Sequence, residues 1–249
     1  YLDRWGRSYQ QEIEQVLDKI AQALSYSFPT TELARFNAHD CSEFYFSSPF
    51  FYPVLNKSKE VYRNTQGAFD PTVQPWLEAW SHSKEVPPSA EQLRSLQAYV
   101  GLDYIVANER RAKKLKEGVR LDFGGLLQGY AADQVAALLR ARGIVHMQIA
   151  LGGNVVAHGR PSKGQAWHTV LEPMAAFLTA TTKHPTLKVT DQAVAKVSRQ
   201  TQEAAHQDIW IDPATGAFPQ HTLLAAVVIA PDCITAEAYA TAMMVRGLP

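Results

Sequence analysis

The chain has 249 residues, of which 46% are hydrophobic and 19% charged, enough to bury a full core as one large domain or two coupled lobes. Lys plus Arg equals Asp plus Glu at 24 each, so no net basic field would draw the protein to nucleic acid or to a membrane surface. Nucleic acid is therefore not an expected partner, and any anionic ligand must be held by local groups.

The cysteines and the first residue say little about the compartment. Cys41 and Cys233 lack the spacing of a zinc site and could pair or stay free. No apolar run approaches the length of a membrane span, and no signal peptide is recognisable. Tyr1 in place of an initiator Met suggests a processed or trimmed product, so the compartment cannot be inferred directly.

The first part of the chain is predicted to be mainly helical. Apolar residues at helical spacing predict an amphipathic helix over residues 8–24, and a loop over 28–32 is expected to cap a short helix that ends at Asn37. A second long helix is expected over 49–65. Two prolines within residues 67–75 then require a loop and a new start, and a linker leads into a helix over 91–99.

The second part is predicted to be richer in strands. The basic run 110–116 is expected to be a solvated turn, and residues 173–208 are less regular. An antiparallel sheet is expected to continue through 155–158 and 167–172, with 161–164 as the hairpin. Strands are predicted at 104–107, 118–122, 145–151, 155–158, 167–172 and 223–230, a strand and turn at 209–216, and a helix at 235–245. The predicted fold class is α+β, with no internal repeat.

The most informative stretch is residues 119–133, where a predicted strand gives way to a helix over 130–142. Gly124, Gly125 and Gly129 would let the backbone approach a ligand, and a helix N-terminus favours a phosphate. Asp122 would repel that phosphate unless a cation or a ligand N–H or O–H lay between them. From this stretch alone, a plain turn in which Asp122 caps the helix is the favoured interpretation.

Four segments, taken in order, resemble the signatures of the ApbE-type FAD:protein FMN transferases. They are Gly-Ala-Phe-Asp-Pro-Thr-Val at 67–73, Leu-Asp-Phe-Gly-Gly-Leu-Leu-Gln-Gly-Tyr-Ala-Ala-Asp at 121–133, Leu-Gly-Gly-Asn at 151–154 and Asp-Pro-Ala-Thr-Gly at 212–216. Weaker matches at 25–37 and 229–242 also fall in register. The resemblance implies a single ApbE-like, T-fold-related α+β domain over 1–249, with mixed or antiparallel sheets, packed helices, and the site between two lobes if these form.

The resemblance also implies an activity. Members of the family take FAD and a divalent cation, usually Mg²⁺, and transfer FMN through a phosphoester bond to a threonine or serine of a partner protein, releasing AMP. Some relatives hydrolyse FAD instead. A periplasmic enzyme is implied, with any membrane attachment made through a lipid anchor that this chain does not contain.

The site residues implied by the resemblance fall into two groups. Glu237 and Thr241, which share one helix face at i and i+4, would hold the cation together with the Gly125 carbonyl. Asp122 would accept hydrogen bonds from an adenine amino group or a ribose hydroxyl, and it joins Glu237 and Thr241 as the residues assigned to catalysis. The positions assigned to the flavin nucleotide are Ser27, Ala68, Phe69, Asp70, Asp122, Gln128 and Ile209.

Three positions depart from the family pattern. Gln128 stands where Lys is common, Glu237 where Asp is common, and Ile209 where His is common. Structural roles also remain open: Phe69 in the core, and Asp70 as a turn cap.

Two further structural interpretations concern the later motifs. Residues 212–216 could form an ordinary Asx turn, and Glu237 with Thr241 could be an exposed helical pair. Two functional hypotheses follow: an active flavin transferase, or a flavin-binding or partner-binding protein on the same scaffold that has lost transfer.

Overall fold

The computed structural model describes residues 1, 3, 5–26, 28–82, 87–161, 164–170, 186–199 and 210–247. Its largest sheet is antiparallel with the strand order β4-β5-β8-β9. The strands are β4 (Met147–Leu151), β5 (Asn154–His158), β8 (Gln192–Ser198) and β9 (Ala225–Ala230).

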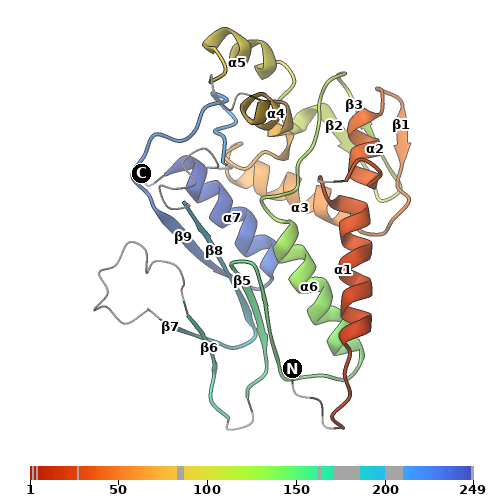
Figure 1. Cartoon of the computed structure of the whole chain (residues 1–249), viewed down its shortest axis with the longest axis vertical. Coiled ribbons are helices and arrows are strands. Elements are labelled where there is room, and N and C mark those ends of the chain that lie inside the picture. Colours follow the sequence, from red (N-terminus) through yellow and green to blue (C-terminus); the bar gives the residue numbers. More distant parts are fainter. Residues whose placement is uncertain are drawn as a thin grey trace.

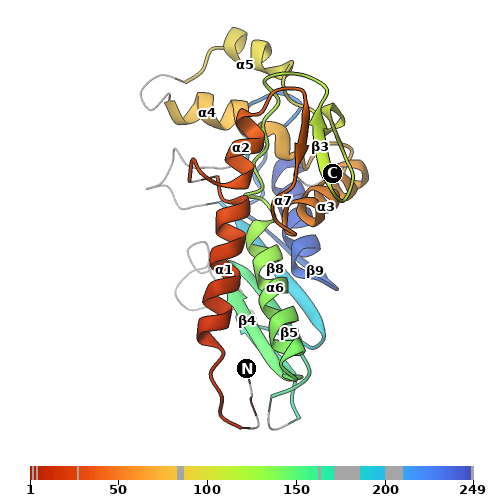
Figure 2. The same cartoon turned by 90° about the vertical axis from the view of Figure 1, so that its right-hand side faces the viewer.

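Two helices cover one face of this sheet. They are α6 (Leu127–Ala141) and α7 (Cys233–Arg246), and α1 (Gln10–Leu24) lies on the outer side of α6 (Figures 1 and 2). The α7 face is rich in alanine: Ala236 and Ala240 are buried against Ala195 of β8 and Ala226 of β9. Small side chains on both surfaces let the helix lie close to the sheet, which fixes the position of every α7 side chain.

A second group of elements packs against the first turns of α6 and against the face of α7 that carries Ile234, Ala238 and Ala242 (Figure 1). Its three-stranded antiparallel sheet has the order β1-β3-β2, and its core contains the mutually packed rings of Phe36, Phe44, Phe51 and Phe123. The elements are α2 (Glu32–Ala38), β1 (Glu43–Tyr45), α3 (Phe51–Asn64), the 3₁₀ turn Pro71–Val73, α4 (Gln74–His82), α5 (Ala90–Gln97), the 3₁₀ turn Leu102–Tyr104, β2 (Ile105–Ala107) and β3 (Arg111–Lys114).

The helix predictions are confirmed with small shifts of their ends. Thr31 caps α2 by accepting the Ala34 N–H at 3.1 Å. Ser89 and Gln92 form a reciprocal capping box that starts α5. The α+β class is confirmed, because the strands pair in antiparallel sheets against which the helices pack.

Several strand predictions are wrong. The basic run is not a solvated turn, because it contains β3, in which Lys114 is buried and donates to the Asn37 carbonyl at 3.1 Å. Residues 118–122 do not form the predicted strand. The predicted continuation from 155–158 into 167–172 does not form, since β6 (Trp167–Val170) pairs with β7 (Thr186–Val189) instead.

Residues 173–208, for which no regular structure was predicted, contain the strands β7 and β8. Polar and charged residues in both strands interrupt the apolar pattern that predicts a strand. The β6–β7 pair packs on the face of the main sheet opposite to α6 and α7, through Val189, Val194 and Ala157.

Cys41 and Cys233 are both free thiols, which settles the pairing left open by the sequence. Among the described helices, none is long and apolar enough to cross a membrane.

Candidate functional site

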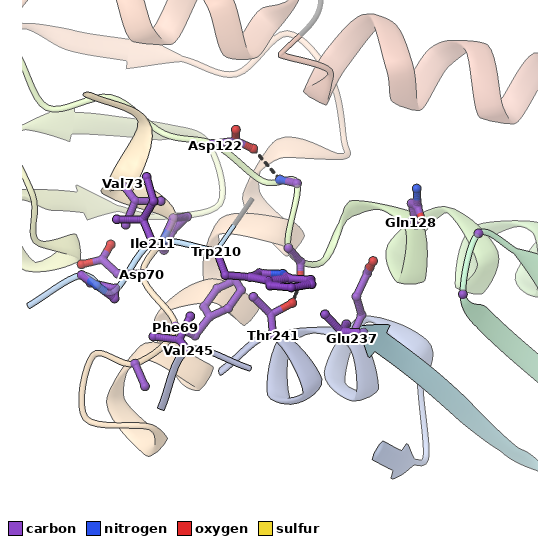
Figure 3. Close-up of a pocket in the computed structure, with 18 of the residues that line it drawn as sticks. Phe69, Asp70, Val73, Asp122, Gln128, Trp210, Ile211, Glu237, Thr241 and Val245 are labelled. Carbon is purple, nitrogen blue, oxygen red and sulfur yellow. Dashed lines mark hydrogen bonds between the residues drawn. The ribbon is translucent and has the colours of Figure 1, made fainter. Parts of the chain in front are cut away.

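A cavity of about 690 Å³ lies where the two groups of elements meet (Figure 3). Its wall combines the loop before α4, the turn before α6, the β4–β5 turn, the end of β8 and one face of α7. The described residues that line it are Ala68, Phe69, Asp70, Pro71, Val73, Asp122, Gly124, Gly125, Gln128, Gly152, Gly153, Asn154, Lys196, Val197, Ser198, Trp210, Ile211, Pro213, Glu237, Thr241 and Val245.

Asp70 is held by its own turn. One oxygen of its buried carboxylate accepts the Thr72 N–H at 2.8 Å and the Thr72 hydroxyl at 2.6 Å, so Asp70 caps the 3₁₀ turn Pro71–Val73. Burial raises the pKa of Asp70 to about 6, although the bonds from Thr72 oppose the shift. The structural interpretation of Asp70 is therefore correct, and the same carboxylate also lines the cavity.

Asp122 is positioned by a clamp from α2. The Asn37 side chain accepts the Leu121 N–H at 2.7 Å and donates to the Leu121 carbonyl at 2.8 Å, while the Asp122 N–H donates to the Pro71 carbonyl at 2.7 Å. The Asp122 carboxylate accepts the Gly124 N–H at 2.6 Å (Figure 3). Burial raises the pKa of this carboxyl.

The expected cap of α6 by Asp122 is wrong. The helix begins at Leu127, and its N-cap, Leu126, makes no side-chain capping bond. Glu237 of α7 supplies a capping carboxylate instead, since it accepts the Gly129 N–H at 2.6 Å. A carboxylate at this helix end disfavours the bound phosphate that the glycine-rich turn suggested.

Glu237 is buried rather than part of an exposed pair. Removal from water raises its pKa to about 7, despite the opposing effect of the Gly129 N–H and the Asn154 amide. One turn along α7, the Thr241 hydroxyl donates to the Gly125 carbonyl at 3.0 Å. The structure thus brings the three predicted cation ligands to one cavity wall, although Gly125 lies 116 positions from Thr241 in sequence.

The donor set suits a hard cation. Carboxylate, hydroxyl and backbone carbonyl oxygens are the ligands that Mg²⁺ takes, usually together with water. Asn154 adds a buried amide oxygen that has no hydrogen-bond partner within the described structure. In the described residues no group of three or more His, Cys, Asp or Glu side chains could hold a metal, so a cation here would depend on these mixed oxygens.

The cavity carries more negative than positive side chains. Asp70, Asp122 and Glu237 are its acids, and Lys196 is the basic residue among those described on its wall. Gln128 is exposed and lies directly over Gly152, where a Cβ would overlap the Gln128 amide oxygen. A polyphosphate ligand would therefore need added positive charge.

A further loop closes the cavity beside α4. Asp212 accepts the Ala214 N–H at 2.9 Å and the Thr215 hydroxyl at 3.0 Å, which confirms the Asx turn. The Trp80 indole donates to the Gly216 carbonyl at 2.9 Å and anchors this turn to α4. The anchored turn holds Ile211 against the cavity.

Most of the predicted site residues meet in this cavity. Ser27 and Ile209 lie outside the described residues. Phe69 serves both the core and the cavity wall. Asn154, Lys196 and Trp210 also line the cavity, although the sequence analysis gave them no role.

Sequence signals for these three residues differ in strength. Asn154 ends the recognisable Leu-Gly-Gly-Asn motif and could have been assigned. Lys196 stands in the unrecognised strand β8, and Trp210 precedes the Asx turn without any motif of its own.

Comparisons with known proteins agree with this arrangement. The family model described as "ApbE family" matches residues 2–249. A protein named FAD:protein FMN transferase from Vibrio cholerae is 25% identical, over 97% of this chain and 74% of the relative. A protein of the same name from Haemophilus influenzae is 29% identical, over 95% of this chain and 72% of the relative.

Solved structures share the fold. The apo flavinyl transferase ApbE of Pseudomonas stutzeri superposes with a TM-score of 0.83 at 25% identity, over 95% of this chain and 74% of that one. The flavin transferase ApbE of Vibrio cholerae gives a TM-score of 0.88 at 24% identity, over 98% of this chain and 81% of that one.

Proposed function

The chain belongs to the ApbE family, and we propose that it is an FAD:protein FMN transferase. It moves FMN from FAD to a threonine or serine of a partner protein and releases AMP. The observation that carries this proposal is the convergence of the Gly125 carbonyl, Glu237 and Thr241 on a cavity that also presents Asp122. The names of the relatives from Vibrio cholerae and Haemophilus influenzae support the same activity.

The cavity is suited to a dinucleotide. Its volume of about 690 Å³ lies within the range of small-molecule and cofactor sites. Gly124, Gly125, Gly152 and Gly153 line it without side chains, while Phe69 offers apolar surface. Asp122 accepts hydrogen bonds from the nucleotide, as an adenine amino group or a ribose hydroxyl would donate.

The cation, Mg²⁺ in this proposal, is held by Glu237, Thr241 and the Gly125 carbonyl. When bound, it neutralises the charge that three acidic side chains and a diphosphate would otherwise bring together. Glu237 and Thr241 would hold this positive charge within the cavity that takes the nucleotide. The Thr241 hydroxyl donates to the Gly125 carbonyl, and both oxygens would be available to the cation once that hydrogen bond is given up.

The transfer step breaks the phosphoanhydride bond of FAD and forms a phosphoester bond to the acceptor. The acceptor hydroxyl oxygen bonds to the FMN-side phosphorus, the bond from that phosphorus to the bridging oxygen breaks, and AMP leaves with that oxygen. The hydroxyl proton is released to solvent. Asp122 holds the nucleotide in place for the reaction.

Two features favour the alternative of a binding protein with impaired transfer, or of an FAD pyrophosphatase. Gln128 places a neutral amide on the wall, and Glu237 already uses one oxygen on the Gly129 N–H. In hydrolysis, water would replace the acceptor hydroxyl and give free FMN and AMP.

The location belongs to the same proposal. A periplasmic enzyme, held at the inner membrane by a lipid anchor where one is present, would meet its acceptor there. The support for this is family membership.

The direct test of the function is a transfer assay. Purified protein is mixed with FAD, Mg²⁺ and a threonine-bearing acceptor domain, and both the acceptor mass and AMP are measured. An acceptor heavier by one FMN, with equal AMP, supports the transferase. Free FMN with AMP identifies the pyrophosphatase, and FAD binding without either product identifies the binding protein.

A further inference from the structure

The start of α7 and the segment from Gly125 to Asp133 are joined by three hydrogen-bonded rungs. Asp133 accepts the Cys233 N–H at 2.9 Å, Glu237 accepts the Gly129 N–H at 2.6 Å, and Thr241 donates to the Gly125 carbonyl at 3.0 Å. Each rung advances by four residues on one segment and moves back by four on the other. We refer to these three contacts as the α6–α7 ladder.

Four residues correspond to about one helical turn and roughly 6 Å of rise, so the ladder aligns one face of each segment turn by turn. Two of its rungs contain the predicted cation ligands, Glu237 and Thr241 with the Gly125 carbonyl. The remaining rung, at Asp133, lies outside the described cavity wall. Asp133 therefore touches the site only through the helix that it holds.

The Asp133 rung has the most hydrogen bonds of the three. Its second oxygen accepts the Cys233 N–H at 3.0 Å and the Ile234 N–H at 2.9 Å, so this one carboxylate binds the first two N–H groups of α7. The contact is also close: a Cβ at Gly129 would overlap the Cys233 carbonyl oxygen. Helices this near each other cannot slide without breaking the rung.

Helix capping alone does not account for Asp133. α7 already has a local N-cap, Asp232, whose carboxylate accepts the Thr235 N–H at 2.9 Å. Asp133 is half-buried, and loss of water raises its pKa to about 6 although the Cys233 and Ile234 N–H groups oppose the shift. A desolvated carboxylate is costly, and its distinctive contribution is to connect two helices rather than to cap one.

We propose that Asp133 is a positioning residue for the cation site: by closing the first rung of the α6–α7 ladder, it sets the register of α7 that lets Glu237 and Thr241 face the Gly125 carbonyl. This inference rests on the proposed function, because it assigns a use to the same three ligands. Asp133 itself touches neither cation nor nucleotide. Its effect is on their affinity.

The test compares two changes of equal charge at one helix end. Asp133→Asn weakens the contact between helices, while Asp232→Asn leaves the ladder intact and keeps a residue type that caps well. Mn²⁺ serves as the probe, titrated into the whole protein at saturating FAD and followed by electron paramagnetic resonance. Thermal unfolding is measured on the same samples without metal.

We expect Asp133→Asn to weaken Mn²⁺ binding by about tenfold or more, the scale seen when a supporting group behind metal ligands is lost. Asp232→Asn should leave Mn²⁺ binding within about twofold of the wild type, because it removes equal charge but no rung. Should Asp133→Asn fail to fold, Asp133→Glu replaces it: the longer side chain keeps the charge, shifts α7, and should weaken Mn²⁺ binding in a folded protein.

Two outcomes would overturn the inference. One is equal weakening by Asp133→Asn and Asp232→Asn, which would indicate a general charge effect. The other is lowered thermal stability in Asp133→Asn or Asp133→Glu with Mn²⁺ affinity unchanged, which would leave Asp133 a purely structural residue. Failure of the wild type to bind Mn²⁺ with FAD contradicts the cation site itself, and so separates the proposed function from the inference.

Discussion

The two acidic sides of the cavity are built in different ways. On the loop side, Asp70 and Asp122 satisfy their carboxylates within two residues, through Thr72 and Gly124. On the helix side, Glu237 and Thr241 depend on partners 108 and 116 positions away. These two carboxylates keep their own hydrogen bonds when distant packing changes, although Asn37 of α2 also helps to position Asp122. The helix side, in contrast, exists only when α6 and α7 meet in the correct register. Changes on the helix side should therefore affect the site most.

The largest effect is expected from Glu237→Ala. Loss of this carboxylate removes the one charged ligand of the cation and should reduce FMN transfer by about 100-fold or more. Transfer is measured by acceptor mass over a Mg²⁺ titration. Glu237→Gln keeps an acceptor for the Gly129 N–H and should lose transfer equally, while Glu237→Asp keeps the charge and should retain cation dependence. Wild-type Mg²⁺ dependence in Glu237→Ala would place the cation elsewhere.

A smaller effect is expected on the loop side. Asp122→Asn keeps the acceptor for the Gly124 N–H but removes the charge, and should weaken FAD binding by about tenfold. FMN binding should change less, since FMN lacks the adenosine that Asp122 is proposed to contact. Calorimetry with both ligands measures this difference. Equal loss for FAD and FMN would contradict the assignment of Asp122 to the adenosine half.

Changing the charge of Lys196 or Gln128 should alter FAD binding by as much as Asp122→Asn does, or by less. Lys196→Met removes the basic residue of the described wall and should weaken FAD binding by about fivefold, whereas Gln128→Lys should strengthen it. Both effects should shrink at high salt, because screening weakens exposed charge pairs. An FAD affinity that is unchanged in both variants would show that the phosphates lie away from the β4–β5 turn.

The smallest expected effect is the pH dependence of the metal-free protein. Glu237 has a pKa of about 7 when folded, against an ordinary value of 4.5, so the folded state binds its proton more tightly than the unfolded state. Stability contributed by this group should therefore fall as pH rises from about 4.5 to about 7. Glu237→Gln lacks the titration, so its melting temperature should gain on the wild type over that range.

Magnesium should reverse this trend in the wild type. The cation binds the ionised carboxylate, so the rise in melting temperature on adding Mg²⁺ should be larger at about pH 8 than at about pH 5.5. Asp70 and Asp133 titrate in both proteins and cancel in the comparison with Glu237→Gln. An Mg²⁺ effect that is independent of pH would contradict a role for Glu237.

The sequence predicted the local features of this molecule well and its distant pairings poorly. The Asx turn at Asp212 and the cap at Thr31 depend on neighbours within three residues, and both were predicted. β8 was missed because its place in the centre of a sheet is set by β5 and β9, not by its own residues. The basic run failed for the same reason: Lys114 is buried by its bond to Asn37 and by its place over the Phe36 ring.

The candidate site follows the same division. The six motifs, which follow the order of the family, predicted which residues line the cavity. A family resemblance relates segments that are far apart in sequence, whereas physical reasoning on one segment does not. Physical reasoning on residues 119–133 alone predicted that Asp122 caps α6, and this was wrong. The carboxylate that caps this helix comes from Glu237, 108 positions away, so no local pattern could reveal it.

The central claim is that the three oxygen ligands on the helix side support transfer of FMN. Mass spectrometry of a threonine-bearing acceptor, incubated with the protein, FAD and Mg²⁺, tests it most directly. The account predicts an acceptor heavier by one FMN, matched by released AMP, which both disappear when Mg²⁺ is chelated and in Glu237→Gln. An unmodified acceptor in the presence of bound FAD and Mg²⁺ would contradict it.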